Sequence, residues 1–254
     1  MKSNLKQMIV ALSFAGACIP QLALAQDHAA CPDHEGGFGP FDYASARAED
    51  IGVVERHHFT PQVESLARGV TGTVGGEIDY TIRAFPNHYR ALNAMSKLSI
   101  REKTPRPRGL HCCVDGYFER AIRFRPEDAM VRTVYGLHLH RWKKMDKAKQ
   151  QFEEAARLAP DDVNIAYNLG LVYADLKEWE KASRYAQVAY GGGFALPGLK
   201  NKLQKAGKWK EPTPRQVKAD ETNLKKPSGD SVNGIPTEQA DVKEKTDKKE
   251  QADK

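Results

Sequence analysis

The central part of this 254-residue chain repeats itself with a period of 34 residues. Residues 129–162 align with residues 163–196, and apolar or small residues recur at the same places in both segments. The matching positions are Tyr135, Gly136, Leu139, Ala148, Phe152, Ala155 and Pro160 in the first segment, and Leu169, Gly170, Tyr173, Ala182, Ala186 and Ala189 in the second. A unit of this length cannot bury its apolar face alone, so the sequence predicts a stack of similar units.

Within each unit the spacing predicts a pair of packed helices. Gly136 and Gly170 allow a neighbouring helix to approach closely, and alanines stand where the helices are expected to cross. Apolar residues recur at steps of three or four through residues 163–176, which is the spacing of one helix face. Asp161 or Asp162 is expected to cap the start of that helix.

A third, degenerate unit is predicted upstream, and a terminal helix downstream. The residues that match the second half of a unit are Tyr117, Phe118, Ala121 and Pro126. The first helix of this unit is predicted over residues 87–100, and an insertion that contains Pro105, Pro107 and Gly109 separates the two halves. Residues 199–206 predict an amphipathic helix that shields the last unit from solvent.

This pattern resembles the tetratricopeptide repeat, over residues 87–207 or about half of the chain. The resemblance implies a mainly α fold with two clear helical hairpins and one degenerate hairpin. Proteins of that family bind peptides or partner helices on the concave face made by the first helices. By this resemblance the partner-binding residues are Met130, Thr133, Leu137, His140, Asn164, Tyr167, Asn168 and Leu171. Family members that clamp carboxylates need Lys and Asn where this chain has Thr133 and Leu137, so chaperone C-termini are not the expected ligand.

Residues 26–86 carry no recognisable family motif and are expected to form a small α+β or irregular N-terminal cap. Residues 53–59 have the composition of a strand. Residues 78–85 alternate as a strand does, but their apolar residues also fit the spacing of a helix. Residues 60–68 begin with Thr-Pro and carry a glutamate close behind, which is typical of a capped helix.

The N-terminal residues 1–25 have the features of an export signal. Two lysines precede an apolar run at residues 8–19, and residues 23–25 supply small side chains before a cleavage site at Gln26. Cleavage before a lipid-modified Cys18 is the alternative. The mature chain is therefore expected to be periplasmic or secreted, and its sequence contains no second apolar run of membrane-spanning length.

Residues 208–254 are expected to form a disordered, charged tail. They contain eleven Lys or Arg and ten Asp or Glu residues, which are interleaved and make no basic patch. Two of the six formal positive charges of the chain belong to Lys2 and Lys6 of the export signal. The mature chain is thus only moderately basic, and we expect no nucleic-acid partner.

Three cysteines remain after removal of the signal: Cys31, Cys112 and Cys113. In an oxidising compartment, a disulfide from Cys31 to Cys112 or to Cys113 would hold the N-terminal arm against the repeats. A disulfide between the two adjacent cysteines is a second possibility. As an alternative, Cys31, His34, Cys112 and Cys113 offer sulfur and nitrogen ligands to a zinc or copper ion.

The sequence contains none of the common enzyme motifs. It has no Gly-rich phosphate loop, no Gly-x-Ser-x-Gly elbow and no His-Glu-x-x-His helix. We therefore expect an exported, non-enzymatic scaffold that uses no cofactor and binds a protein or peptide. The rival hypothesis is a periplasmic metal or redox accessory protein that uses the cysteines and His34.

Overall fold

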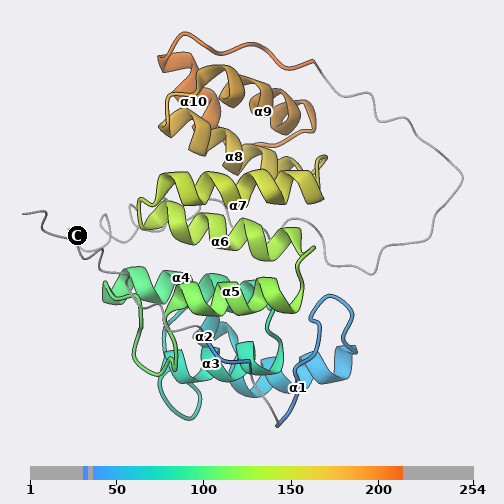
Figure 1. Cartoon of the computed structure of the whole chain (residues 1–254), viewed down its shortest axis with the longest axis vertical. Helices are drawn as coiled ribbons and strands as arrows, with labels where there is room; N and C mark the ends of the chain where they lie inside the picture. Colours follow the sequence, from blue (N-terminus) through green and yellow to red (C-terminus); the bar gives the residue numbers. More distant parts are fainter. Residues whose placement is uncertain (1–30, 34–36, 214–254) are drawn as a thin grey trace, which may run out of the picture.

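The computed structural model describes residues 31–33 and 37–213. Within this part the chain forms ten helices and no strand, so the expected mainly α fold is confirmed. The helices are α1 (Ala48–His58), α2 (Pro61–Glu64), α3 (Val74–Ala84), α4 (Tyr89–Glu102), α5 (Val114–Phe124), α6 (Ala129–Arg141), α7 (Met145–Leu158), α8 (Val163–Asp175), α9 (Trp179–Gly191) and α10 (Gly198–Lys205). Figure 1 shows them stacked in layers along the long axis, from α1 to α3 at one end to α9 and α10 at the other.

Several predicted segments lie outside the described residues. These are the export signal with Cys18, the proposed metal ligand His34, and residues 214–254 of the predicted tail. Among the helices that the structure does describe, none combines the length and the apolar composition that a membrane span requires.

Two consecutive helix pairs, α6 with α7 and α8 with α9, begin and end alike. Asp128 and Asp162 cap α6 and α8, and each carboxylate accepts two backbone N–H bonds of 2.8 to 3.0 Å. Shortly after the last turns of α6 and α8, Lys143 and Lys177 adopt left-handed φ angles of 60° and 61°. The members of each pair of residues are 34 positions apart, as the sequence repeat requires.

The pair α4 and α5 uses the same helix ends with a longer connection. His88 caps α4 by accepting the N–H of Ala91 at 3.1 Å, and Lys103 follows the helix with a φ of 53°. Each lies 40 residues before its counterpart at α6, whereas α5 and α7 end only 34 residues apart. The additional residues therefore lie in the loop between α4 and α5, which carries Cys112.

The turn that separates the pairs also follows α3, upstream of the predicted repeat region. In each turn the carbonyl of the residue after the helix accepts the N–H three residues later, and a proline lies between them. The bonds join Phe85 to His88, Arg125 to Asp128 and Ala159 to Asp162, at 3.0, 3.2 and 3.2 Å. Helix-turn units of this kind thus begin before residue 87.

The strand expected at residues 53–59 is wrong, and of the two alternatives left open for residues 78–85 the structure shows the helix. Residues 53–58 belong to α1 and residues 78–84 to α3. Ile78 and Ile82 are both fully buried, and helical geometry brings these residues, one turn apart, onto the same face of α3. Thr73 fixes the start of α3 because its hydroxyl accepts a backbone N–H of the first turn.

The predicted helix at residues 60–68 is much shorter in the structure. Only α2, at Pro61–Glu64, is helical, and Pro61 stands at its first position as expected. Leu66 adopts a left-handed φ of 62°, which ends the turn and sends the chain toward α3.

The repeat glycines lie at points of close approach between helices. A Cβ atom at Gly136 would lie 2.8 Å from the ring of Phe152 on α7. A Cβ atom at Gly170 would lie 2.4 Å from a methyl group of Leu199 on α10. The predicted terminal helix is confirmed in α10, where Leu199 and Leu203 are fully buried.

The first six residues of the predicted charged tail, 208–213, belong to the described part of the chain and contact the last helices. The ring of Trp209 packs edge-on against that of Tyr190, with 5.3 Å between the centroids. Gln187 of α9 donates a hydrogen bond of 2.9 Å to the carbonyl of Lys210. Residues 208–213 therefore lie against the last helices, where Trp209 packs against their apolar cluster.

Candidate functional site

The eight predicted partner-binding residues lie on α6 and α8, and most of them are buried. Met130 and Asn164, in the first turns, are half-buried. The buried members are Thr133, Leu137, His140, Tyr167, Asn168 and Leu171. The ring of Tyr167, for example, stacks on that of Phe194 with 4.3 Å between centroids. The middle of both helices is thus engaged in internal packing.

Intramolecular polar contacts hold three of the buried polar members of this set: Thr133, His140 and Asn168. The amide of Asn168 donates to the carbonyl of Asn164 at 2.9 Å. Nε2 of His140 lies 3.0 Å from Asp175, which also pairs with Lys202 of α10. Burial acts to raise the pKa of Asp175, but the hydrogen bonds with His140 and Lys202 outweigh it and hold the pKa below its ordinary value. This chain of charges joins α6, α8 and α10.

A small cavity lies among these residues. Its lining consists of Leu137, His140, Phe152, Asn168, Leu171 and Val172. The volume of about 10 Å³ is close to the space of one water molecule. Oδ1 of Asn168 is buried and has no hydrogen-bond partner among the described residues, so a water or another small donor suits this position.

A disulfide joins Cys31 to Cys112, which is one of the two pairings expected for the N-terminal arm. The Cα atoms are 5.5 Å apart, and Cys31 is buried against α5. A Cβ atom at Gly116 would lie 3.2 Å from the Cβ of Cys31, so a larger residue would require Cys31 to shift slightly. Cys113 is the N-cap residue of α5 and lies outside the disulfide.

The described residues offer no group of three or more His, Cys, Asp or Glu side chains arranged to hold a metal ion. Two of the four ligands in the alternative hypothesis, Cys31 and Cys112, are bonded to each other. A zinc or copper site would require them as thiolates, and a disulfide does not supply thiolates. The disulfide and a site built on these two sulfurs therefore exclude one another.

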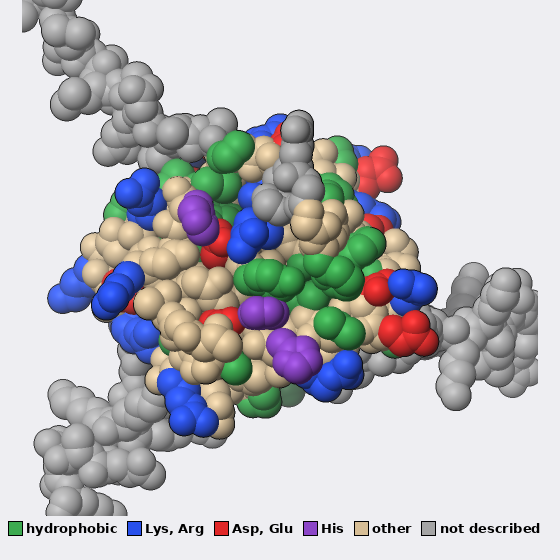
Figure 2. Space-filling view, turned by 90° about the horizontal axis from the view of Figure 1, so that it is seen from below, with side chains coloured by type: hydrophobic (Ala, Val, Ile, Leu, Met, Phe, Trp, Pro, Cys, Tyr) green, Lys and Arg blue, Asp and Glu red, His purple; other side chains and the backbone are tan. Residues whose placement is uncertain are grey.

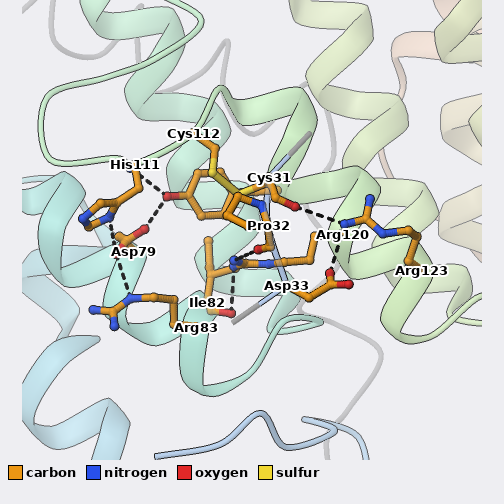
Figure 3. Close-up of a disulfide and its surroundings, with 11 residues drawn as sticks. Cys31, Pro32, Asp33, Asp79, Ile82, Arg83, His111, Cys112, Arg120 and Arg123 are labelled. Atoms are coloured by element: carbon orange, nitrogen blue, oxygen red, sulfur yellow. Dashed lines mark hydrogen bonds and ion pairs between the residues drawn. A yellow bond between two sulfur atoms is a disulfide. The ribbon is translucent and has the colours of Figure 1, made fainter. Parts of the chain in front are cut away.

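Three polar side chains converge on Asp79 beside the disulfide (Figure 3). The carboxylate is buried and accepts hydrogen bonds from the hydroxyl of Tyr117 and from Nε of Arg83, the latter at 2.9 Å. Nδ1 of His111 lies 3.0 Å from the same carboxylate. Burial, followed by the bond to Asp79, raises the pKa of Tyr117. These residues come from α3, α5 and the inserted loop, and only the spacing of Asp79 and Arg83 was visible in the sequence.

Arg120 of α5 is a buried cation in the same region (Figure 3). Its two terminal nitrogens donate to the carbonyls of Ile82 and Pro32, at 3.3 and 3.4 Å. Among the described residues, its Nε has no hydrogen-bond partner and no carboxylate lies within ion-pairing distance. The guanidinium carbon is 5.0 Å from the ring centroid of Tyr117. Burial lowers the pKa of Arg120 because desolvation penalises its charged form.

Two cavities of about 300 Å³ each meet at Asp33 and Arg120. The first is also lined by Pro32, Asp79, Arg83, His111, Cys112 and Tyr117. The second is also lined by Pro40, Pro86, Arg123 and Phe124. We call them the disulfide cavity and the proline cavity. Sequence reasoning missed both, because their walls come from the N-terminal arm, α3 and α5.

Ser96, His138 and Asp115 form a chain with the composition of a hydrolase triad. Nδ1 of His138 lies 3.1 Å from the hydroxyl of Ser96, and its Nε2 lies 3.3 Å from Asp115. Lys144 donates to Asp115 at 2.8 Å, and Arg141 donates to the Ser96 oxygen at 3.0 Å. Ser96 is fully buried, so a substrate cannot reach its hydroxyl. The chain instead ties α4, α5 and α6 together.

The two ends of the stack differ in how they are covered. Figure 2 shows hydrophobic side chains next to histidines on the end that carries α1 and α3. Phe38 and Val53, in the N-terminal part of the described chain, are among the exposed large hydrophobic residues. The other end is closed by α10 and Trp209, whose apolar groups pack inward.

No model of a protein family matches the chain, and no curated protein matches it at a significant level.

Proposed function

We propose that this chain is an exported, non-enzymatic scaffold of the tetratricopeptide type, and that it holds a protein or peptide partner on its first helices. The observation that carries the proposal is the register of the helix ends. The caps of α6 and α8 are 34 residues apart, and so are the left-handed lysines that follow these helices. Stacked helix pairs of equal length present equivalent helices side by side, which suits the binding of an extended or helical segment.

The partner is proposed to contact the first turns of α6 and α8 rather than their middles. Met130 and Asn164 occupy equivalent places in the two repeats and are both half-buried. The residues farther along these helices are buried, so their side chains are not available to a partner without rearrangement. A segment lying across the two first turns would cover both side chains at once.

The proposal includes the location of the chain in an oxidising compartment. The disulfide between Cys31 and Cys112 is of the kind that persists in exported proteins and is rare in reducing ones. It supports a periplasmic or secreted location, in agreement with the export signal expected at residues 1–25.

Site-specific photo-cross-linking tests the proposed face. A photoreactive amino acid in place of Met130 or Asn164 is expected to trap the same protein from both positions, in the cells that export the chain. The matched controls are Gln150 and Arg184, which are exposed on α7 and α9 and are also 34 residues apart. Equal trapping from the control positions, or none from Met130 and Asn164, would contradict the proposal.

The mass of the exported protein tests its processing. We expect a chain that starts at Gln26 and is two hydrogen atoms lighter than its reduced form, because one disulfide has formed. A chain that starts at a lipid-modified Cys18 would instead place the scaffold on a membrane surface.

A further inference from the structure

Within the part of the chain that the structure describes, the buried guanidinium of Arg120 has no carboxylate partner. Its side chain is buried, and its terminal nitrogens donate only to the carbonyls of Ile82 and Pro32, at 3.3 and 3.4 Å. Charge-assisted bonds are shorter, at about 2.7 to 2.9 Å. Its Nε–H has no acceptor in the described part of the chain. A carboxylate would supply two oxygens in the side-on geometry that a guanidinium prefers.

The other charges around the two cavities are already paired. Asp79 is bonded to Arg83 at 2.9 Å and approached by His111 at 3.0 Å, and Asp33 is bonded to Arg123 at 3.0 Å. Each carboxylate is therefore matched by one arginine. Among the described residues, no carboxylate lies within ion-pairing distance of the Arg120 guanidinium, and Asp33 and Asp79 act on it only from farther away. A singly charged anion would therefore balance the described charges of the site.

The proline cavity adds an apolar wall to this charge. Pro40, Pro86 and Phe124 line it, and Phe124 is one of the exposed large hydrophobic residues of the described chain. Rings of this kind offer flat contact surfaces to an aliphatic or aromatic group. A cavity of about 300 Å³ lies at the lower end of the range for sites of small molecules.

We propose that the two cavities form a binding site for a small organic acid, whose carboxylate pairs with Arg120 and whose apolar body lies against Pro40, Pro86 and Phe124. The disulfide holds Pro32 and Asp33 in place beside the guanidinium, because it fixes Cys31 to the loop that precedes α5. The site is separate from the first turns of α6 and α8, so it does not depend on the scaffold function proposed above.

Isothermal titration of the oxidised full chain with 3-phenylpropanoate tests the proposal. We expect one molecule to bind per chain. The neutral amide of the same acid should bind at least about tenfold more weakly, since it cannot form the charge-assisted pair. Acetate should also bind about tenfold more weakly, since it lacks the apolar body. Inorganic phosphate is the fourth probe, and it reports on charge alone.

Two variants locate the acid. Arg120→Met is expected to abolish the difference between the acid and its amide. Arg157→Met is the matched control, because Arg157 is exposed on α7 and pairs only locally with Glu154. Phe124→Ala is expected to weaken binding of 3-phenylpropanoate by about fivefold while leaving acetate unchanged, because only the apolar contact is lost.

The outcomes separate the parts of the proposal. Equal binding of the acid and its amide, or equal binding of the acid by the Arg120→Met variant, overturns the pairing with Arg120. Phosphate that binds as tightly as 3-phenylpropanoate overturns the assignment to an organic acid. If Arg120→Met fails to fold, Phe124→Ala still decides the matter, because Phe124 is at the surface. An unchanged affinity of that variant for 3-phenylpropanoate overturns the placement of the ligand.

Discussion

His88 is a single buried residue that controls both the start of a helix and the response of the protein to acid. Its Nδ1 accepts the N–H of Ala91, so the ring proton is assigned to Nε2, which donates to Glu55 at 3.1 Å. Burial lowers the pKa of His88, and the bond to Glu55 opposes this effect only in part. A second proton would have to enter at Nδ1, where it would remove the cap of α4.

Stability is expected to decline when the pH falls from about 7.5 to about 5.5. Burial lowers the pKa of both His88 and His138 below the ordinary value of 6.5. Below that pH the two histidines therefore bind more protons in the unfolded chain than in the folded chain. Their contribution is complete above pH 6.5 and is lost progressively below it. Urea unfolding at a series of pH values measures the decline.

The variant His88→Asn provides the control for this pH dependence. Asparagine can accept a capping hydrogen bond but does not titrate. We expect lower overall stability, because the buried ring is lost, together with a flatter dependence on pH. Stability that rises as the pH is lowered to about 5.5 would refute the assignment.

Gly136 is the residue at which the smallest change should disturb the packing of a helix pair. A Cβ atom there would lie 2.8 Å from the ring of Phe152, which is itself fully buried. Gly136→Ala should lower the free energy of unfolding by about 1 to 2 kcal/mol, even though alanine favours helices. Urea denaturation measures the loss. A double variant with Phe152→Leu should recover part of it if the contact is the cause.

Among the helices, the residues that cap α6 and α8 repeat more regularly along the sequence than the pattern of buried and exposed side chains does. Residues 133–140 of α6 and 165–174 of α8 are buried without interruption, because neighbouring helices cover these helices on several sides. Their sequences therefore lack a strong polar face, and periodicity alone identifies them weakly. The caps and the prolines mark the same helices clearly, because each acts on the backbone within a few residues.

Replacing Lys143 or Lys177, which follow α6 and α8, with glycine is expected to stabilise the chain. Both have left-handed φ angles, which strain any residue with a Cβ atom. Lys143→Gly and Lys177→Gly should each raise the free energy of unfolding by about 0.5 to 1 kcal/mol. Lys147→Gly, at an exposed position inside α7, should lower it by about 1 kcal/mol. Thermal and urea unfolding of the three variants check the contrast in sign.

At the scale of the whole molecule, the disulfide makes the N-terminal arm part of the helical stack. Cys31 belongs to the same apolar cluster as residues of α3, α4, α5 and α6. Arg123 reinforces the attachment by donating to the carbonyl of Cys31 at 3.1 Å and pairing with Asp33. The arm in turn supplies one wall of each cavity beside Arg120.

Reduction of the disulfide should destabilise the chain by roughly 4 kcal/mol, as expected for a cross-link that closes a loop of this length. The bonded cysteines are 81 residues apart in the sequence. Urea unfolding with and without dithiothreitol measures the difference. A double variant, Cys31→Ser with Cys112→Ser, should be as unstable as the reduced chain and insensitive to the reductant. A stability that does not change on reduction would contradict the tethering role.

Local sequence signals predict the helices of residues 87–207 and several of the positions at which these helices begin and end. Asp162 and Pro160 act on the backbone of their immediate neighbours, so a linear pattern contains the information. The sequence also limited the disulfide to pairings of three cysteines, and it predicted α10 from the spacing of its leucines. These features depend on contacts within a few residues or one helix turn.

The N-terminal helices, the disulfide pairing and the charged residues beside it follow from how the helices pack. The apolar spacing of residues 78–85 suits both a strand and a helix, and burial of one face of α3 selected the helix. The choice of Cys112 over Cys113, and the meeting of Asp79 and Arg120 beside it, join segments that are far apart along the chain. Such meetings depend on how whole helices pack, and no local pattern in the sequence specifies the packing.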